Sequence, residues 1–220
     1  MKFRKAVGRA GSVAAAGLLV AASGAIAHAG TGARQVHGAR AVSGARADSD
    51  WGEIRPEFSG HFSGLFTNQK CLALNAGDGF NNNNARVFQW DCNGHNDQQW
   101  STHLYTFAPN SGIPLFQVIN LASRKCMELR QVSTTAGTQV DQYTCLGGSI
   151  DDISNQLWEI NPVPGSTIDY DLVPWTAGRT AQPTCLDVRG GDNSNGVMVE
   201  EWTCNGGTNQ QFFGSPFAGH

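Results

Sequence analysis

The chain of 220 residues carries 15 Lys and Arg against 18 Asp and Glu, together with 27 Gly and six Cys. The acidic excess lies from Trp51 onward, where eight Lys and Arg face sixteen Asp and Glu, a formal charge of about −8. A surface that binds nucleic acid begins with a basic patch, so we expect no nucleic-acid partner for this part of the chain.

The first 29 residues have the organisation of a secretory signal peptide. Four basic residues precede an apolar run over 13–27, and Ala27-His28-Ala29 gives a small-x-small cleavage pattern. The run is short and rich in Ala and Gly, which argues against a membrane-spanning helix, and no second apolar run follows. We therefore predict a secreted, extracellular protein with no membrane span.

Residues 30–50 are rich in Gly, Ala and Arg, and the triplet Gly-Ala-Arg recurs at 32–34, 38–40 and 44–46. These residues have little apolar area to bury, so a flexible linker or a pro-segment is expected. Contact of the three spaced Arg with an anionic surface is the weaker interpretation.

The remaining part, 51–220, contains three copies of one pattern. Each copy has two Cys, a Val five residues before the second Cys, an aromatic residue two before it, and a closing Gln-x-aromatic. The copies span Cys71–Trp100, Cys126–Trp158 and Cys185–Phe212. Their first cysteines are 55 and 59 residues apart (126 − 71 and 185 − 126). Such a period indicates one architecture built from similar units.

Short apolar runs between Gly and Asn turns, without a sustained period of 3.6, predict strands rather than helices. Units of about 55 residues are marginal as independent domains, so the three should share one core. The repeated Val and the closing aromatic would supply it. The predicted fold class is all-β, a β-trefoil with pseudo-threefold symmetry and repeats at roughly 58–108, 113–162 and 166–217.

Within this frame, Trp51–Gly60 is an opening segment that we expect to pair with the C-terminus. The first strands of the three repeats are predicted at His61–Thr67, Leu115–Asn120 and Ile168–Pro174. The third repeat also carries an excursion, Trp175–Pro183, to which the sequence assigns no role.

All six cysteines lie inside the repeats, two in each, which is typical of a disulfide framework in an oxidising compartment. Six cysteines allow fifteen pairings, and the repeat selects one of them. The predicted disulfides are Cys71–Cys92, Cys126–Cys145 and Cys185–Cys204. A zinc site is disfavoured because the chain has no Cys-x-x-Cys pair and no convergent His, so we expect no metal or other cofactor.

The third repeat contains the residue types that a sugar site requires. A carboxylate accepts hydrogen bonds from adjacent hydroxyls, an aromatic ring covers the C–H face of the sugar, and amides donate and accept. Asp187, Trp202, Asn209 and Gln210 supply this set. The alternative is that Trp202 belongs to the core and Asp187 is an ordinary surface residue. Because Asp187 has apolar neighbours on both sides, we favour the sugar site.

These motifs, C-L-D-V, a Gly/Asn turn, V-x-x-W-x-C and N-Q-x-aromatic, resemble the ricin B-type lectin family with its Q-x-W repeats, over about 160 residues. The resemblance implies a β-trefoil that binds carbohydrate, with one shallow pocket per repeat. The Asp would take sugar hydroxyls, the aromatic would stack, the Asn would bond a hydroxyl and the Gln would orient the Asp. The implied carbohydrate-binding residues are Asp187, Glu200, Trp202, Asn209 and Gln210.

Two positions of the third repeat depart from the family pattern. Glu200 stands where many members have Gln, which would change the hydroxyl preference, and Phe212 replaces the usual closing Trp. We expect the second change to be mild because it lies in the core.

The other repeats depart further. In the second repeat a second carbohydrate site is implied by Glu128, Asp141, Tyr143, Asn155 and Gln156. Glu in place of Asp moves the carboxylate outward by one methylene, and the loop that follows Cys145 is longer than in the other repeats.

The first repeat lacks the central carboxylate. Ala73 stands in place of the Asp, Phe88 at the polar position and Asp97 in place of the Asn, although Trp90 and Gln98 are kept. We therefore expect no sugar binding there and a role in folding alone.

The predicted function is a secreted, non-catalytic lectin that binds carbohydrate chiefly through the third repeat. Beside the trefoil we expect no room for a catalytic domain, and no Ser-His-Asp or Cys-His set is suggested. We interpret the adjacent acids, Asp151 with Asp152 and Glu200 with Glu201, as solvated rather than as a hydrolytic pair. The alternative is a β-trefoil that acts through protein contacts, as a hydrolase inhibitor or surface interaction module, with vestigial sugar pockets.

Overall fold

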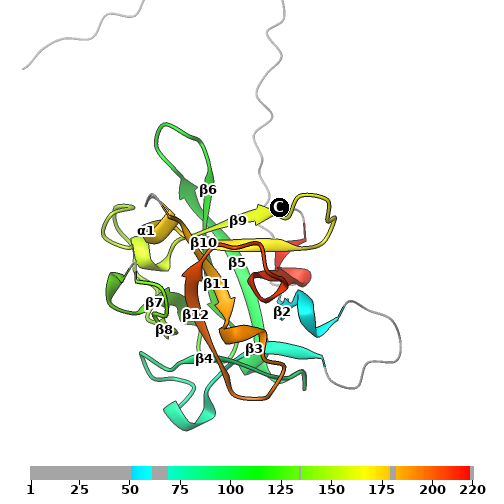
Figure 1. The fold of residues 1–220 in the computed structure, drawn as a ribbon. Helices are drawn as coiled ribbons and strands as arrows, with labels where there is room; N and C mark the ends of the chain where they lie inside the picture. Colours follow the sequence, from blue (N-terminus) through cyan, green and yellow to red (C-terminus); the bar gives the residue numbers. More distant parts are fainter. Residues whose placement is uncertain (1–50, 61–68, 134, 179–181, 219–220) are drawn as a thin grey trace, which may run out of the picture. The chain divides into compact units, whose positions relative to one another are not determined.

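The computed structural model describes residues 51–60, 69–133, 135–178 and 182–218 (Figure 1). The predicted signal peptide and linker lie outside these residues, as do the strand predicted at His61–Thr67 and part of the 175–183 excursion. Within the described ranges, none of the helices has the length and apolar character needed to cross a bilayer.

The described residues form thirteen strands, which confirms the all-β prediction. Their bounds are β1 (Gly52–Glu53), β2 (Arg55–Pro56), β3 (Lys70–Leu74), β4 (Val87–Asp91), β5 (Gln99–Phe107), β6 (Pro114–Asn120), β7 (Cys126–Leu129), β8 (Val140–Tyr143), β9 (Trp158–Pro162), β10 (Tyr170–Pro174), β11 (Thr184–Val188), β12 (Val197–Thr203) and β13 (Gln211–Phe213).

Helical structure is confined to single turns. The α-helix is α1 (Trp175–Gly178). The 3-10 helices of the described residues are η1 (Glu57–Ser59), η2 (Ala76–Asp78), η3 (Asn96–Gln98), η4 (Arg130–Val132), η5 (Ser154–Gln156), η6 (Arg189–Gly191), η7 (Thr208–Gln210) and η8 (Ser215–Phe217).

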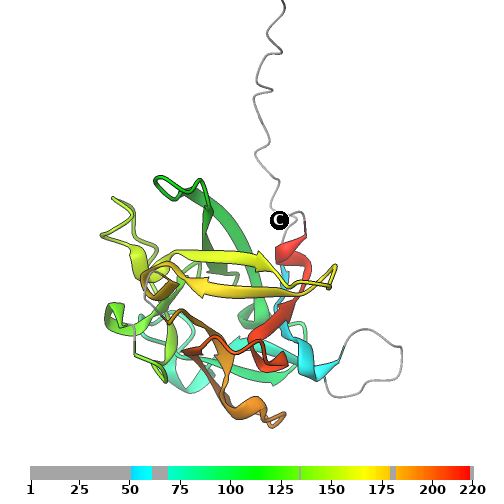
Figure 2. The same cartoon turned by 45° about the horizontal axis from the view of Figure 1, so that its top comes forward.

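One series of antiparallel strands closes on itself in the order β1-β5-β6-β9-β10-β13-β2 (Figures 1 and 2). Residues 52–56 join its two ends, because β1 pairs with β5 and β2 pairs with β13. Phe212 lies opposite Pro56, so the predicted pairing of the opening segment with the C-terminal part is confirmed. In the first repeat, residues 52–56 therefore occupy the position that β6 occupies in the second repeat and β10 in the third.

Each repeat also contributes a hairpin, β3–β4, β7–β8 or β11–β12, and the three hairpins interlock. β12 pairs with β4, and isolated bridges join Arg86 to Asp141 and Gln139 to Glu200. Each hairpin is cross-linked by its own disulfide. The three bonds are Cys71–Cys92, Cys126–Cys145 and Cys185–Cys204, the pairing that the repeat predicts.

The repeated apolar positions meet in one core. The three Val and the three closing aromatics are fully buried in the same cluster, namely Val87, Val140, Val199, Trp100, Trp158 and Phe212. The two indoles also bind backbone, because Trp100 Nε1 donates to the Leu72 carbonyl at 2.9 Å and Trp158 Nε1 to the Met127 carbonyl at 3.2 Å. Phe212 fills the third position without such a donor, so shape rather than the indole bond is common to all three.

The excursion of the third repeat has a packing role. Trp175, the first residue of α1, is 4% exposed and lies in a second apolar cluster with Leu115, Ile153 and Leu157. The longer loop of the second repeat supplies Ile153, so this loop and Trp175 stabilise each other by apolar packing.

Candidate functional site

The third repeat gathers its polar residues around the carboxylate of Asp187. Asp187 lies on β11 and is 3% exposed. Its Oδ2 accepts hydrogen bonds from Gln210 Nε2 at 2.8 Å and from Asn209 Nδ2 at 2.9 Å, both on η7. Gln210 Nε2 also donates to the Thr203 carbonyl, and its Oε1 accepts from the backbone of Asn205. Both amide hydrogens of Gln210 are used and its side chain is 1% exposed, so its role is to orient Asp187 rather than to meet a ligand.

Asn209 is held in a similar way. Its Nδ2 donates to the Val188 carbonyl at 3.2 Å as well as to Asp187, so both amide hydrogens are used. Only its Oδ1 remains, and Asn209 can therefore meet a ligand only as an acceptor.

An ion pair between Arg189 and Glu200 lies beside Asp187, and Arg189 was not among the predicted site residues. Glu200 on β12 is 3% exposed, and Arg189 donates to its Oε2 from Nε at 2.8 Å and from Nη2. Arg189 follows Asp187 by two residues, and Arg130 follows Glu128 in the same way. The sequence therefore contained a signal for this ion pair. The second and third copies both have an acid-x-Arg motif, and both also have an acid four residues before the second Cys.

Trp202 stands at the edge of the same site. It is 45% exposed, so the interpretation of Trp202 as a core residue is wrong. A turn of the second repeat lies against its ring, where a Cβ built on Gly137 would be 3.6 Å from Trp202 Cζ3. Gly137 has φ +91°, and its N–H donates to the Glu201 carbonyl at 2.7 Å. This turn of a neighbouring repeat thus positions the aromatic ring.

Together these side chains line an open depression of about 560 Å³, which we call the third-repeat pocket. Its lining residues are Asp187, Arg189, Gly190, Glu200, Trp202, Asn205 and Asn209. Of the predicted site residues only Gln210 is absent from the surface of the pocket, because it lies behind Asp187. Arg189 and Asn205 are additions that the sequence analysis missed.

The electrostatics of the pocket centre on a carboxyl group that is costly to ionise. Burial raises the pKa of Asp187 from 3.8 to about 6, and the nearby Glu200 carboxylate acts in the same direction. Hydrogen bonds from Gln210 and Asn209 and the charge of Arg189 oppose this increase. At neutral pH Asp187 is thus ionised and partly desolvated, a state suited to accepting strong hydrogen bonds.

The second repeat reproduces the same network around Glu128. Glu128 Oε2 accepts from Gln156 Nε2 at 2.9 Å and from Asn155 Nδ2 at 3.1 Å. Arg130 Nε donates to Asp141 Oδ2 at 2.6 Å, in the position of the Arg189–Glu200 pair. Burial raises the pKa of Asp141 to about 6 and also raises that of Glu128. The extra methylene of Glu128 therefore does not disturb the hydrogen bonds around the carboxylate.

The first repeat has lost the whole charged set. Ala73, Asn75 and Phe88 occupy the places of Asp187, Arg189 and Glu200. Because all three are uncharged, the first repeat contains no acid or Arg at these positions that would lack its partner.

The interpretation of Glu200 and Glu201 as solvated acids is wrong. Glu201 is fully buried, its Oε2 accepts from Thr184 Oγ1 at 2.7 Å, and burial raises its pKa. Both residues lie on β12, which is covered by β11 on one side and bridged to Gln139 of the second repeat on the other. Asp151 and Asp152 are exposed, as expected.

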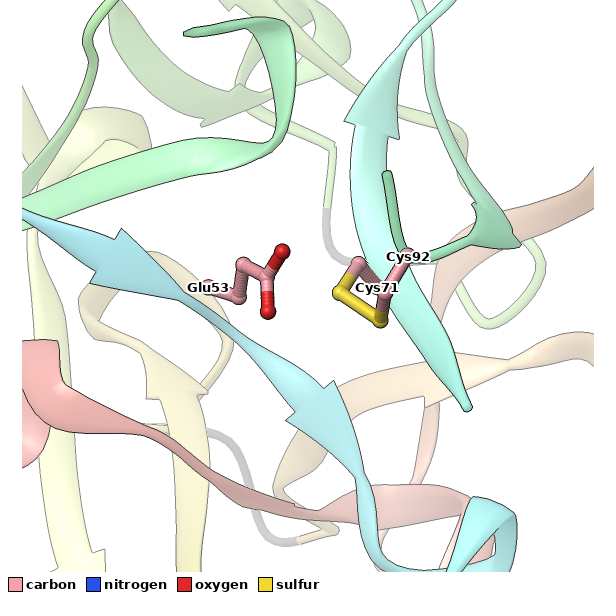
Figure 3. Close-up of side chains that lie close together, drawn as sticks. All are labelled: Glu53, Cys71 and Cys92. Carbon is pink, nitrogen blue, oxygen red and sulfur yellow. A yellow bond between two sulfur atoms is a disulfide. The ribbon is translucent and has the colours of Figure 1, made fainter. Parts of the chain in front are cut away.

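One group of potential metal ligands occurs among the described residues, namely Glu53, Cys71 and Cys92 (Figure 3). The two sulfur atoms are joined in the first disulfide, so neither is a thiolate. Glu53 is bound by Arg55, whose Nε donates to its Oε2 at 3.1 Å. The group is therefore a disulfide beside an ion pair rather than a zinc site.

Replacing Arg189 with Met is expected to lower the free energy of unfolding by about 1–3 kcal/mol at pH 7. The change leaves the buried Glu200 carboxylate without its partner, and exposure of more than half of the Arg189 side chain moderates the loss. Chemical denaturation would measure it. Arg189→Met combined with Glu200→Gln should recover most of the loss, and equal stability of the single variant and the wild type would contradict the prediction.

Interlocked repeats of this kind, with a buried carboxylate oriented by a Gln and faced by an exposed aromatic, define a β-trefoil of the lectin class. Residues 58–212 match the family model of the ricin-type β-trefoil lectin domain. The chain therefore belongs to this family. No curated protein sequence matches it.

Solved structures agree on the fold. The designed threefold-symmetric protein ThreeFoil has a TM-score of 0.57 at 24% identity, covering 75% of this chain and 97% of that one. An exo-β-1,3-galactanase from Clostridium thermocellum has a TM-score of 0.57 at 23% identity, covering 76% and 30%. The Macrolepiota procera ricin B-like lectin, in complex with lactose, has a TM-score of 0.52 at 14% identity, covering 74% and 93%.

Proposed function

We propose that this protein is a secreted carbohydrate-binding protein that holds a sugar in the third-repeat pocket. The observation that carries the proposal is the state of Asp187. Two amides fix its Oδ2, whereas its Oδ1 accepts no hydrogen bond from the described residues, although the carboxylate lines the pocket. A carboxylate oriented through one oxygen presents the other to a ligand that can donate, and adjacent sugar hydroxyls are such donors.

Trp202 and Asn209 complete the binding surface. The exposed indole offers an apolar face to the C–H side of a pyranose ring, and Asn209 Oδ1 offers a second acceptor. The pocket is open and polar, so a single sugar should bind in the millimolar range, about −4 kcal/mol.

The charges of the pocket favour a neutral sugar. Asp187 and Glu200 contribute two negative charges and Arg189 one positive charge, which Glu200 already engages. A uronic or sialic acid would place its carboxylate in a site of net negative charge, at an electrostatic cost.

The second repeat is proposed as a weaker second site. Glu128 has the same two amide donors as Asp187, with its Oε1 free of partners among the described residues, and Tyr143 takes the place of Trp202. Two sites on one rigid body would strengthen binding to a polymer through effective concentration.

The proposal includes no catalysis. Two acids line the third-repeat pocket. Glu200 is held by Arg189, so among the described residues no second free carboxylate stands beside Asp187 to form a hydrolytic pair. The signal peptide at 1–29, the linker at 30–50 and the trefoil at 51–220 form the proposed organisation, which amino-terminal sequencing of the secreted protein would test.

A glycan array of the purified protein tests the function, with Trp202→Ala as the matched variant. We expect wild-type binding to neutral glycans and its loss in the variant. Absence of all binding by the wild type would favour the alternative of a trefoil that acts through protein contacts. Unchanged binding by the variant would move the site to the second repeat, and turnover of an arrayed glycan would indicate an enzyme.

Sugar affinity should depend on pH through Asp187. Because its pKa is raised to about 6, the carboxylate that accepts the hydroxyls is ionised above this value and protonated below it. Affinity is therefore expected to be constant above about pH 7 and to fall about tenfold per pH unit well below 6. Titrations between pH 4.5 and 8 would measure it, and a profile that stays flat down to pH 4.5 would contradict it.

A further inference from the structure

The first repeat, which has lost its charged set, retains a cavity of about 420 Å³ that we call the first-repeat pocket. Three aromatic rings line it, those of Phe80, Phe88 and Trp90, together with Ala73. The volume lies in the range of small-molecule sites, which are mostly apolar with a few polar groups. The substitutions that removed a sugar site have thus left an aromatic pocket.

The walls of this pocket are fixed by the neighbouring repeats. Gln142 of the second repeat donates from Nε2 to the carbonyls of Phe80 and Asn82 at 2.7 and 2.9 Å. On the other side, a Cβ built on Gly196 of the third repeat would be 3.4 Å from Trp90 Cζ3. Phe80 and Trp90 remain 38% and 48% exposed in these fixed positions. A ligand therefore meets aromatic surface that needs little ordering.

Among the described residues, Asp97 is the only acid that lines the pocket. It stands in the place of Asn209, across from the lost carboxylate. Within the described residues, no other side chain donates a hydrogen bond to its carboxylate. Burial raises the pKa of Asp97, and the main opposing influences are its own backbone amide and His95, which also lines the pocket. Among the described residues, this carboxylate therefore lacks the side-chain partner that the acids of the other two repeats have.

The rings are suited to positive charge. The guanidinium carbon of Arg86 lies 5.2 Å from the centroid of the Phe88 ring, which shows that a cation is accommodated against it. Arg86 itself is held by Asp78 at 2.8 and 2.9 Å and does not line the pocket. The cation that would balance Asp97 is thus not supplied by Arg86.

We propose that the first-repeat pocket binds a small organic cation, an ammonium group with apolar substituents, between the aromatic rings and the carboxylate of Asp97. The rings attract the charge and cover the substituents, and Asp97 adds an opposite charge beside them. A sugar fits less well, because Ala73 and Phe88 stand where the third repeat has its acids, and hydroxyls placed against them would lose water without receiving hydrogen bonds from these two residues. The proposal is independent of sugar binding in the third repeat.

The test is an NMR titration of the isotope-labelled protein with choline and, separately, with 3,3-dimethylbutan-1-ol, which has the same shape without the charge. At constant ionic strength, choline should shift the Trp90 indole resonance and bind at least tenfold more tightly than the alcohol. Asp97→Asn should remove this difference and leave affinity for the alcohol unchanged. The variant places at 97 the residue that the other two repeats carry, and its spectrum reports whether it folds.

Two further variants locate the site. Trp90→Ala should weaken both probes at least tenfold, whereas Asp187→Asn should leave both affinities unchanged. Equal affinity for the two probes would reduce the pocket to an apolar cavity and overturn the proposal. It would equally be overturned by full choline binding in Asp97→Asn, by no choline binding at 50 mM, or by a neutral sugar that shifts Trp90 more than choline does.

Discussion

Replacing Asp187 with Asn is expected to weaken sugar binding at the third repeat about 10- to 100-fold and, at the same time, to stabilise the protein at pH 7. The binding loss follows from replacing a charged acceptor of sugar hydroxyls by a neutral one, worth about 1.5–3 kcal/mol. Isothermal titration with a glycan identified on the array would measure it.

The gain in stability follows from the sign of the pKa shift. The folded state raises the pKa of Asp187 from 3.8 to about 6, so it binds more protons than the unfolded state between these values. Stability contributed by this group is therefore present at low pH and is lost as the pH rises toward 6. Asn cannot ionise, and the variant should avoid this loss, on the order of 1–3 kcal/mol at pH 7.

The matched control is Glu128→Gln, which makes the same change of charge in the second repeat. It should leave sugar binding at the third repeat unchanged, because Glu128 belongs to the equivalent network of another repeat. If Asp187→Asn is folded, less stable and fully able to bind, Asp187 serves the fold rather than the site, and the proposed function loses its main support.

Replacing Trp158 with Ala is expected to lower the free energy of unfolding by about 3–5 kcal/mol. Trp158 is fully buried in the shared core, so the change removes a large apolar side chain and leaves a cavity. It also removes the hydrogen bond to the Met127 carbonyl. Urea denaturation followed by circular dichroism would measure the loss.

Two comparisons make this prediction specific. Trp158→Phe should cost only about 1–2 kcal/mol, because the third repeat itself fills the equivalent position with Phe212 and the main loss is one hydrogen bond. Trp202→Ala should cost less than about 1 kcal/mol, because that indole is 45% exposed. Equal costs for Trp158→Ala and Trp202→Ala would contradict the division of the tryptophans between core and site.

The second repeat shows how far an aligned pattern carries a site prediction. Glu128 and its two amides make the same hydrogen bonds as the corresponding residues of the third repeat, although Glu replaces Asp. Alignment succeeds here because the hydrogen bonds are local, within a hairpin and the 3-10 turn that follows it. Arg130 and Arg189 were visible in the same alignment, but their role depends on a contact across the hairpin to an acid on the next strand.

From the sequence alone, the threefold repeat determined the strand pattern, the three disulfides, the buried Val and aromatic positions and the grouping of Asp187 with its amides. These features recur at fixed spacing, and each is satisfied within one repeat or at the common core. Only the tertiary structure decided the features that arise between repeats. These are the burial of Glu200 and Glu201 and the pocket of the first repeat. The physical reason is the same for both. The residues that cover a side chain in one repeat come from a neighbouring repeat that is distant in sequence, so the spacing of residues within a single repeat cannot predict that contact.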